Sequence, residues 1–277
     1  MKSTEPIIHQ IIDQLSGTGV ILSPKSYDEL VLFVSNSQNS DGGFKNRDGS
    51  SDPYYSFFGF LIASGLELTD QLVRLKEYVR QNRDLSTCSY ADRCALLIME
   101  SFFLKKHKKQ WGKAIRIVSR FFSNKDYLQV SYNSFLTMLV VETLVGHPSL
   151  LVRKARRIIK KITVNEAMPI SELFSVLILK CQLGEPFEEE MRLISGYFTG
   201  NSGFRIYPHV SNADLLSTAV ALFAMKHCGI DRRLYAPSAI QFVESQFSDG
   251  AFLSGDGDLT RDLEYTFYGL LALTSVW

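Results

Sequence analysis

QFSDGAF at residues 246–252, followed by a polar loop and then DLEYTFYGLL at 262–271, is the stretch that decides the fold. The same order occurs near the start of the chain, where QNSDGGF at 38–44 precedes DPYYSFFGFL at 52–61. Two copies of so specific a string, about 200 residues apart, indicate an internal repeat. Each copy reads as a helix, an Asp-Gly turn, a loop and an Asp-capped helix, so the sequence predicts a helical repeat protein.

The Asp-Gly turn and the Asp that follows the loop have a physical explanation. Gly after Asp allows the left-handed backbone that ends a helix, and the Asp side chain can bond the backbone two residues on. Asp52 and Asp262 suit a helix N-cap, and Pro53 suits the first helical position. The aromatic residues Phe44 and Phe252 can then fold back under the helix pair. All of these features are also explained by structure alone, without a function.

Length and composition are compatible with one large domain. The chain has 277 residues, 45% of them hydrophobic, and no Ser/Gly linker divides it. We therefore expect one domain over residues 1–277, with residues 1–25 as an N-terminal helix and lead-in. No apolar run approaches the roughly 18 residues of a membrane span, and the N-terminus has no apolar signal core. The four cysteines show neither metal nor redox spacing, and a cytoplasmic protein is the simplest prediction.

Six units follow a short amphipathic helix expected at residues 7–15, and each unit has an outer and an inner helix. The inner segments are apolar almost all round, as buried helices are, whereas the outer segments keep a charged face. Besides the two copies above, inner helices are expected at 90–104, 131–145, 171–183 and 214–228. This pattern predicts an all-α fold, a single α/α toroid (an α6/α6 barrel) of six helical hairpins. A right-handed superhelix is the alternative, but the similarity of the first and last units favours closure.

The repeat resembles that of a known family. The turn Gln-x-x-Asp-Gly-Gly-Phe, followed by Asp-x-x-Tyr-Thr-Phe-Tyr, is similar to the repeat of the prenyltransferase and squalene-cyclase α/α toroids. That family includes the protein prenyltransferase β subunits and the class II terpene cyclases. The resemblance covers nearly the whole chain, is strongest in the first and last units, and implies the fold more specifically than the chemistry. It implies a central cavity that handles an isoprenoid or similar lipid, by prenyl transfer or cyclisation.

The N-terminal ends of the inner helices meet at one mouth of the cavity in such a barrel, and their dipoles make that mouth mildly positive. Below the mouth, Phe58, Phe267 and Tyr268 are expected to form an aromatic wall. A polar ring over an apolar well suits a hydrophobic ligand with a polar head, and aromatic faces stabilise carbocations. The alternative is that these aromatic side chains simply fill the core. Aligning the units predicts this ring at the mouth, with Asn133 as an alternative in the third unit: Tyr55, Asp92, Ser134, Glu172, Ser217 and Tyr265.

The resemblance allows the catalytic groups of the family to be checked by position. Protein prenyltransferases bind zinc through an Asp, a Cys two residues later and a His in the last repeat. Asp214 matches the Asp, but Leu216 and Tyr265 take the other two places. Class II cyclases use Asp-x-Asp-Asp-Thr-Ala, and residues 214–219 keep the first Asp and the Thr-Ala but have Leu216 at the central acid. We therefore expect no metal and no cofactor.

Other carboxyl groups are candidates for catalysis, namely Asp92, Glu172 and Glu264. A carboxyl group in an apolar barrel has a raised pKa, as a general acid requires. The alternative for Asp92 is that it pairs with Arg93 or caps its helix, and Glu172 has a similar alternative. Several cations near the same mouth could hold a prenyl diphosphate, although loop cations are usually only solvated: Arg93, Arg205, His209 and Arg261.

The net charge of +1 is unevenly distributed. Residues 101–161 carry 14 Lys and Arg but only 2 Asp and Glu, with clusters at 105–109 and 153–161. The functional interpretation is peripheral docking on an anionic membrane, where a lipid substrate would be collected, and the simpler one is a solvated helix face. No aromatic residues interleave these charges, so we expect no nucleic-acid partner.

Three functions fit these observations. The first is a metal-independent enzyme acting on an isoprenoid, the second is a non-catalytic toroid that binds a lipid, and the third is a protein-interaction scaffold with a filled centre. The cavity separates them. A well of roughly several hundred Å³ with Asp92 or Glu172 on its wall favours the enzyme, an apolar well without a carboxyl group favours the binding protein, and no well favours the scaffold.

Overall fold

The computed structural model describes residues 5–82, 88–103, 112, 131–146 and 149–277. These residues are mostly helical, which confirms the all-α prediction. The short strands β1 (Phe247–Ser248) and β2 (Ala251–Phe252) pair antiparallel across the last Asp-Gly turn. No helix in the described part of the chain is both long and apolar enough to cross a membrane.

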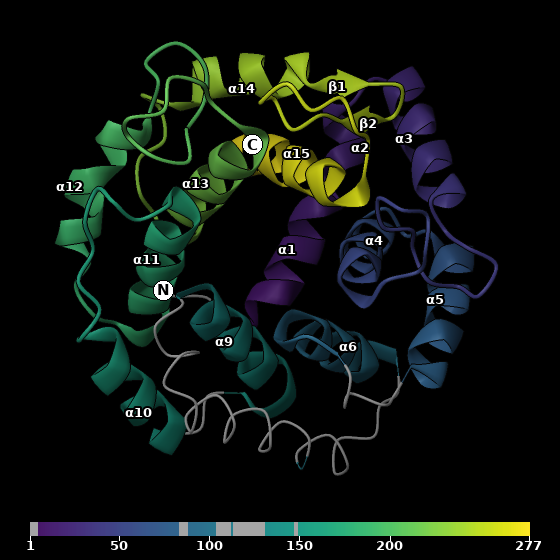
Figure 1. Ribbon diagram of the computed structural model, residues 1–277, viewed down its shortest axis with the longest axis horizontal. Helices are drawn as coiled ribbons and strands as arrows, with labels where there is room; N and C mark the ends of the chain where they lie inside the picture. The colour runs from purple at the N-terminus through teal and green to yellow at the C-terminus, as the bar shows by residue number, and fades with distance from the viewer. Residues whose placement is uncertain (1–4, 83–87, 104–111, 113–130, 147–148) are drawn as a thin grey trace.

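The inner helices form a closed cycle of neighbours (Figure 1). Each one contacts the next along the chain, and the last contacts the first. In chain order they are α4 (Pro53–Gly65), α6 (Tyr90–Phe103), α9 (Ser131–Val145), α11 (Ile170–Leu183), α13 (Leu215–Cys228) and α15 (Leu263–Val276). The four inner helices predicted at 90–104, 131–145, 171–183 and 214–228 agree with the structure to within one residue at each end, because a helix that is apolar on every side has to be buried.

A second set of helices lies outside this cycle in Figure 1. Each precedes an inner helix in the chain, as the hairpin pattern predicts, and four of the five described ones contact that inner helix, whereas residues 188–197 contact the preceding inner helix α11. Between α6 and α9, where the pattern places the outer helix of the third unit, Gly112 is the one residue that the structure describes before residue 131. The described outer helices are α3 (Pro24–Asn36), α5 (Thr69–Gln81), α10 (Ser149–Ile159), α12 (Glu188–Tyr197) and α14 (Ala236–Ser245).

Carboxylates cap three of the inner helices, α4, α13 and α15. The Asp52 side chain accepts the backbone N–H of Tyr55 at 2.9 Å, and Asp262 accepts that of Tyr265 at the same distance. Asp214 does the same for α13. Each cap satisfies an N–H group that has no partner within its helix, a contribution of about 0.5–2 kcal/mol per cap.

The aromatic residue after each turn packs beneath its hairpin. Phe44 and Phe252 are fully buried, and each ring lies directly over a helical glycine, Gly59 or Gly269, seven residues beyond the Asp cap. A methyl group added at either glycine would lie less than 3.0 Å from the ring. The backbone N–H of the aromatic residue donates to a hydroxyl oxygen four residues beyond the cap, in three of the units: Ser56, Thr218 and Thr266.

The Asp-Gly turns also join one hairpin to the next. Gly42 has φ 89° and Gly250 has φ 80°, a conformation that glycine adopts without strain. A side chain at Gly42 would meet the backbone of Arg74 on α5, and one at Gly250 would meet the backbone of Glu29 on α3. The first turn therefore packs on the second outer helix, and the last turn packs on the first outer helix.

Helix α1 (Ile7–Leu15) lies across one end of the ring, followed by the short α2 (Thr18–Ile21) (Figure 1). Its contacts all fall near the C-terminal ends of the inner helices. Gln14 donates to the Leu271 carbonyl of α15, the Ile7 N–H donates to Glu142 of α9, and Leu15 lies against Gly65 of α4. The amphipathic helix was predicted at these residues, but its place at the end of the ring was not.

Candidate functional site

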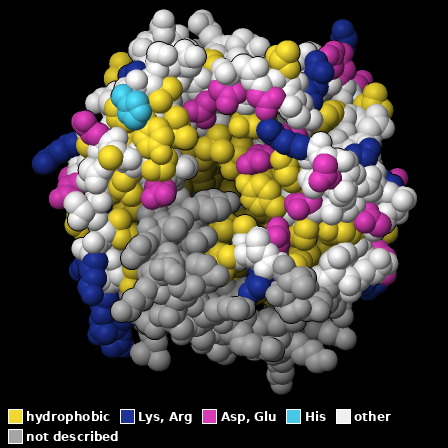
Figure 2. Space-filling model, in the orientation of Figure 1, with side chains coloured by type: hydrophobic (Ala, Val, Ile, Leu, Met, Phe, Trp, Pro, Cys, Tyr) yellow, Lys and Arg dark blue, Asp and Glu magenta, His cyan; other side chains and the backbone are white. Residues whose placement is uncertain are grey.

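A cavity of about 310 Å³ lies among the inner helices. Figure 2 shows the hollow, with hydrophobic side chains on its walls and acidic side chains at its rim. All six inner helices contribute to the wall, and Ile8 and Ile11 of α1 contribute from the end that α1 covers. Helices distant in the chain thus share one apolar space.

Aromatic rings make up much of the wall. Phe58, Phe267 and Tyr268, the predicted aromatic wall, all line the cavity. The Phe58 ring centroid lies 5.3 Å from that of Phe267 and 5.8 Å from that of Tyr268. The Tyr54 ring meets Phe58 edge-on at 4.8 Å. These rings pack against one another along the α4–α15 side and still leave the cavity open, so they do not simply fill the centre.

In four of the inner helices, the side chains that face the cavity begin two residues after the helix cap. Tyr54, Ala91, Ser171 and Leu216 occupy this position and line the cavity. The members of the predicted ring stand one residue later, about 100° further round each helix, and are not among the residues that line the wall of this cavity. They are Tyr55, Asp92, Glu172, Ser217 and Tyr265. The backbone of Ser134 lies in α9, but its side chain lies outside the described residues.

Two side chains of the predicted ring, those of Asp92 and Ser217, have structural partners. Asp92 accepts the Ser89 N–H at 3.1 Å, and the Ser89 hydroxyl accepts the Asp92 N–H at 3.1 Å, which is a reciprocal capping box. The Ser217 hydroxyl donates to the Asp214 carboxylate at 2.5 Å. Asp92 therefore serves its helix end, the alternative that the sequence left open.

Glu172 lies on the first turn of α11, next to Ser171 on the cavity wall. Partial burial raises the pKa of its carboxyl group. Because Ser171 faces the cavity, Glu172 points about 100° away from it around the helix axis.

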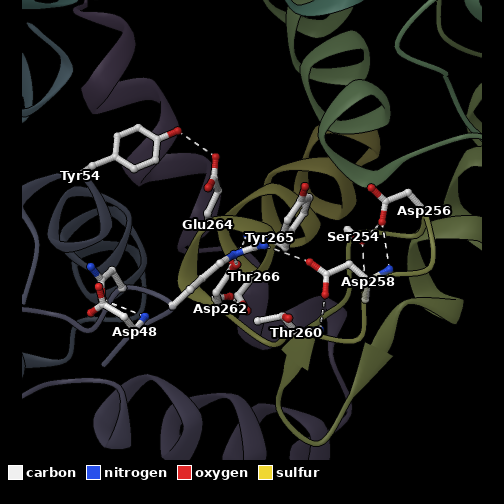
Figure 3. Close-up of polar contacts among 12 residues, drawn as sticks. Asp48, Tyr54, Ser254, Asp256, Asp258, Thr260, Asp262, Glu264, Tyr265 and Thr266 are labelled. Carbon is white, nitrogen blue, oxygen red and sulfur yellow. Dashed lines mark hydrogen bonds and ion pairs between the residues drawn. The ribbon is translucent and has the colours of Figure 1, made fainter. Parts of the chain in front are cut away.

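Glu264 is the acidic residue closest to the cavity-facing row. It stands two residues after the Asp262 cap, which corresponds to Leu216 in α13 and Tyr54 in α4. The Tyr54 hydroxyl, on the cavity wall, donates to the Glu264 carboxylate at 2.8 Å (Figure 3). Burial raises the pKa of Glu264, and the Asp262 carboxylate raises it further, against the opposing effect of the Tyr54 hydrogen bond. A carboxyl group with a raised pKa thus stands beside the aromatic wall.

Arg47 is a residue of this site that the sequence reasoning missed. It belongs to the loop after the first Asp-Gly turn, yet its guanidinium donates to Asp262 at 2.9 Å and to Asp258 at 3.0 Å. It also lies over the Tyr265 ring, 5.7 Å from the centroid. Arg47 therefore links the first and last hairpins at the mouth. One signal was present in the sequence: Arg47 lies in the polar loop of the first repeat, and Asp258 lies in the corresponding polar loop of the last repeat.

The predicted diphosphate-binding cations have other roles or orientations. The Arg205 guanidinium donates to the carbonyls of Phe198 and Val210, and Arg261 pairs with Asp249 at 2.6 Å. Both arginines therefore stabilise the backbone of turns through these contacts. Arg93 lies two residues after Ala91, the cavity-facing position of α6, so it starts on the opposite side of the helix.

The basic clusters are only partly described. Residues 105–109 lie outside the described residues. On and after α10, Arg156 and Lys160 both pair with Glu185, at 3.4 and 3.1 Å. The other cations of 153–161 whose side chains the structure describes are exposed, namely Arg153, Arg157 and Lys161.

Within the described ranges, no group of three or more His, Cys, Asp or Glu side chains is arranged to hold a metal ion. The sequence matches no protein-family model, and it matches no curated protein. The function is therefore inferred from the geometry of the cavity and its mouth.

Proposed function

We propose that this protein is a six-hairpin α/α toroid that holds an isoprenoid or similar small hydrophobic molecule in its central cavity. The observation that carries the proposal is an apolar cavity of about 310 Å³ whose wall comes from every inner helix. The contact between α15 and α4 supports a closed toroid rather than an open superhelix. A scaffold would have no need of such a cavity, and a filled centre would have been more stable.

The size of the cavity suggests a small ligand. Ligand pockets usually measure about 300–1,000 Å³, so this one is at the lower end. At about 30 Å³ for each water-sized group, it has room for on the order of ten heavy atoms. An isoprenoid of roughly ten to fifteen carbon atoms fits this estimate better than a long-chain lipid.

Non-catalytic binding is the function that the wall supports best. Tyrosine hydroxyls and the hydroxyls of Ser171 and Ser175 are the polar side-chain groups among the lining residues, and neither Asp92 nor Glu172 is among them. An apolar wall without a carboxyl group suits a carrier or a sensor of a hydrophobic molecule.

Acid catalysis is a second candidate, favoured by one observation, the Glu264 carboxyl group beside Tyr54. Glu264 would give its proton to one carbon of an alkene, which leaves a carbocation on the other carbon. The neighbouring aromatic rings would stabilise that cation. Return of a different proton from the cation to the Glu264 carboxylate would restore the acid and yield an isomer of the substrate.

Peripheral membrane binding belongs to the same proposal. The exposed cations Arg153, Arg157 and Lys161 form the basic face that would meet anionic lipids. Sedimentation with vesicles that contain phosphatidylserine, compared with neutral vesicles, tests this contact.

The binding proposal is tested by filling the cavity. Val220 lies on the cavity wall, and Val220→Phe would occupy part of the space. Val73 is 63% exposed on α5, so Val73→Phe is the matched control. We expect hydrophobic molecules that co-purify with the wild type to be retained by Val73→Phe and lost from Val220→Phe, as measured by mass spectrometry of solvent extracts. Equal retention by both variants would remove the cavity as the binding site.

The acid proposal needs a separate assay. The protein is incubated with isoprenoid alkenes and alcohols of ten and fifteen carbons, and the products are identified by gas chromatography and mass spectrometry. Glu264→Gln keeps the shape of the side chain but cannot supply the proton, so product formation should stop. Product formation that survives Glu264→Gln would leave binding as the function.

A further inference from the structure

Among the described residues, the side of the cavity mouth formed by the starts of α13 and α15 is acidic. Asp262 and Glu264 stand at the start of α15, and Asp214 stands at the start of the neighbouring α13. The loop before α15 adds Asp256 and Asp258, whose pKa values are lowered by hydrogen bonds from Ser254 and Thr260, respectively. Figure 2 shows acidic side chains on the described part of the rim, and Figure 3 shows Glu264 on one side of Tyr265 and Asp256 and Asp258 on the other.

Arg47, the cation that pairs with these carboxylates, is already engaged, because its guanidinium is shared between Asp258 and Asp262. N–H groups at helix ends otherwise attract anions. Here one such group at the start of each of α4, α13 and α15 donates to the carboxylate of Asp52, Asp214 or Asp262. A diphosphate would therefore meet carboxylates and occupied donors.

The carboxylates at the mouth act on two tyrosine side chains whose pKa values burial already raises. Burial raises the pKa of Tyr265 to about 12, and the charges of Glu264 and Asp256 contribute to the rise. Burial also raises the pKa of Tyr55, with contributions from Asp262 and Glu264. In both cases Arg47 acts in the opposite direction but does not reverse the rise.

The wall beneath the mouth is also suited to positive charge. The faces of aromatic rings attract cations within about 6 Å. Tyr54 and Phe58 of α4 and Phe267 and Tyr268 of α15 form such a wall next to Glu264. A cation at the top of the cavity would therefore have a carboxylate on one side and ring faces below it.

We propose that the ligand of this cavity is a hydrophobic amine, a branched hydrocarbon with a protonated nitrogen that Glu264 and Tyr54 receive at the mouth. The inference rests on the proposed binding function and names the end group of its ligand. It excludes a prenyl diphosphate, the ligand suggested by the resemblance, because that end group carries the opposite charge. A bound ammonium group would keep Glu264 ionised, so amine binding and proton donation by Glu264 are alternative roles.

The test compares three molecules that share one ten-carbon chain: geranylamine, geraniol and geranyl diphosphate. Binding to the full chain is measured by isothermal titration calorimetry at pH 7 and low salt. A charge-assisted hydrogen bond is stronger than a neutral one by an amount that corresponds to about tenfold or more in affinity. We expect geranylamine to bind at least tenfold more tightly than geraniol, and geranyl diphosphate to bind most weakly.

Variants locate the effect. Glu264→Gln should bring the affinity for geranylamine down to that for geraniol, whereas Glu244→Gln, an exposed change on α14, should leave both unchanged. Val220→Phe should weaken the binding of both ligands, a result that would place them in the cavity. Equal affinities for geranylamine and geraniol in the wild type, or tighter binding of the diphosphate, would overturn the inference but leave the binding function. Failure of all three to bind would instead count against the proposed function itself.

Discussion

The contact between the turn aromatic and the helical glycine can be tested by a double-mutant cycle on Gly269 and Phe252. A Cβ at position 269 would lie less than 3.0 Å from the Phe252 ring, and Phe252 is fully buried, so the ring has no route into solvent. Overpacking of this kind costs about 1–3 kcal/mol. Replacing a helical glycine by alanine gains about 1 kcal/mol of helix propensity, so Gly269→Ala should destabilise the protein by roughly 0–2 kcal/mol.

The second arm of the cycle removes the ring. Phe252→Ala should cost about 3–5 kcal/mol because it leaves a cavity in the core. In that background the Cβ at position 269 has space, so Gly269→Ala should now stabilise by about 1 kcal/mol. The expected coupling energy between the two sites is therefore about 1–3 kcal/mol.

Chemical denaturation followed by circular dichroism measures each free energy of unfolding. Gly196→Ala is the control, because Gly196 is an exposed helical glycine on α12 with no atom closer than 3.9 Å to the added Cβ. It should stabilise by up to about 1 kcal/mol. If Gly269→Ala stabilised the wild type as much as it stabilises Phe252→Ala, the coupling would vanish and the explanation of the repeat motif would be refuted.

Further predictions concern buried charges and the mouth. Burial raises the pKa of Glu142 to about 7 from an ordinary value of 4.5, so its contribution to stability is present at low pH and is lost as pH rises through about 7. Between pH 5 and pH 8 the free energy of unfolding of the wild type should fall by on the order of 3 kcal/mol, and this fall should be absent in Glu142→Gln. A variant with the same pH profile as the wild type would contradict this. Lys180 pairs with the fully buried Glu190 at 2.7 Å, so Lys180→Met should cost about 3–5 kcal/mol in urea titrations. Adding Glu190→Gln should recover part of that loss, and no recovery would argue against the ion pair. The pKa of Glu264 is raised, so its carboxylate fraction grows as pH rises, and calorimetry from pH 5 to pH 8 should show geranylamine affinity rising in the wild type but not in Glu264→Gln. Arg47→Met should weaken the link between the first and last hairpins by about 1 kcal/mol or less in thermal unfolding, because the guanidinium is largely exposed.

Local features of the structure could be predicted from the sequence because they depend on neighbouring residues. The caps at Asp52, Asp214 and Asp262 each bind an N–H three residues away, and the spacing of Asp, Gly and Phe was visible in the repeat. The inner helices were also predictable, since their apolar composition requires burial whatever the partner. The aromatic wall followed from the same alignment.

The cavity-facing register could not be predicted with equal accuracy. A row placed one residue late, at Tyr55 instead of Tyr54, points about 100° away from the cavity. In α4 the two positions are both tyrosine, Tyr54 and Tyr55, so composition does not decide between them there. The crossing of each helix with its neighbours sets the rotation, and that depends on packing.

The sequence by itself determined the helices, their caps and the repeating turn, because these depend on residues a few positions apart. Only the tertiary structure decided what meets at the centre. Tyr54 and Glu264 are 210 residues apart in the chain, and their hydrogen bond exists because α15 lies against α4. The acidic character of the mouth likewise depends on which carboxylates Arg47 reaches across the junction of the first and last hairpins, a contact that no local pattern encodes.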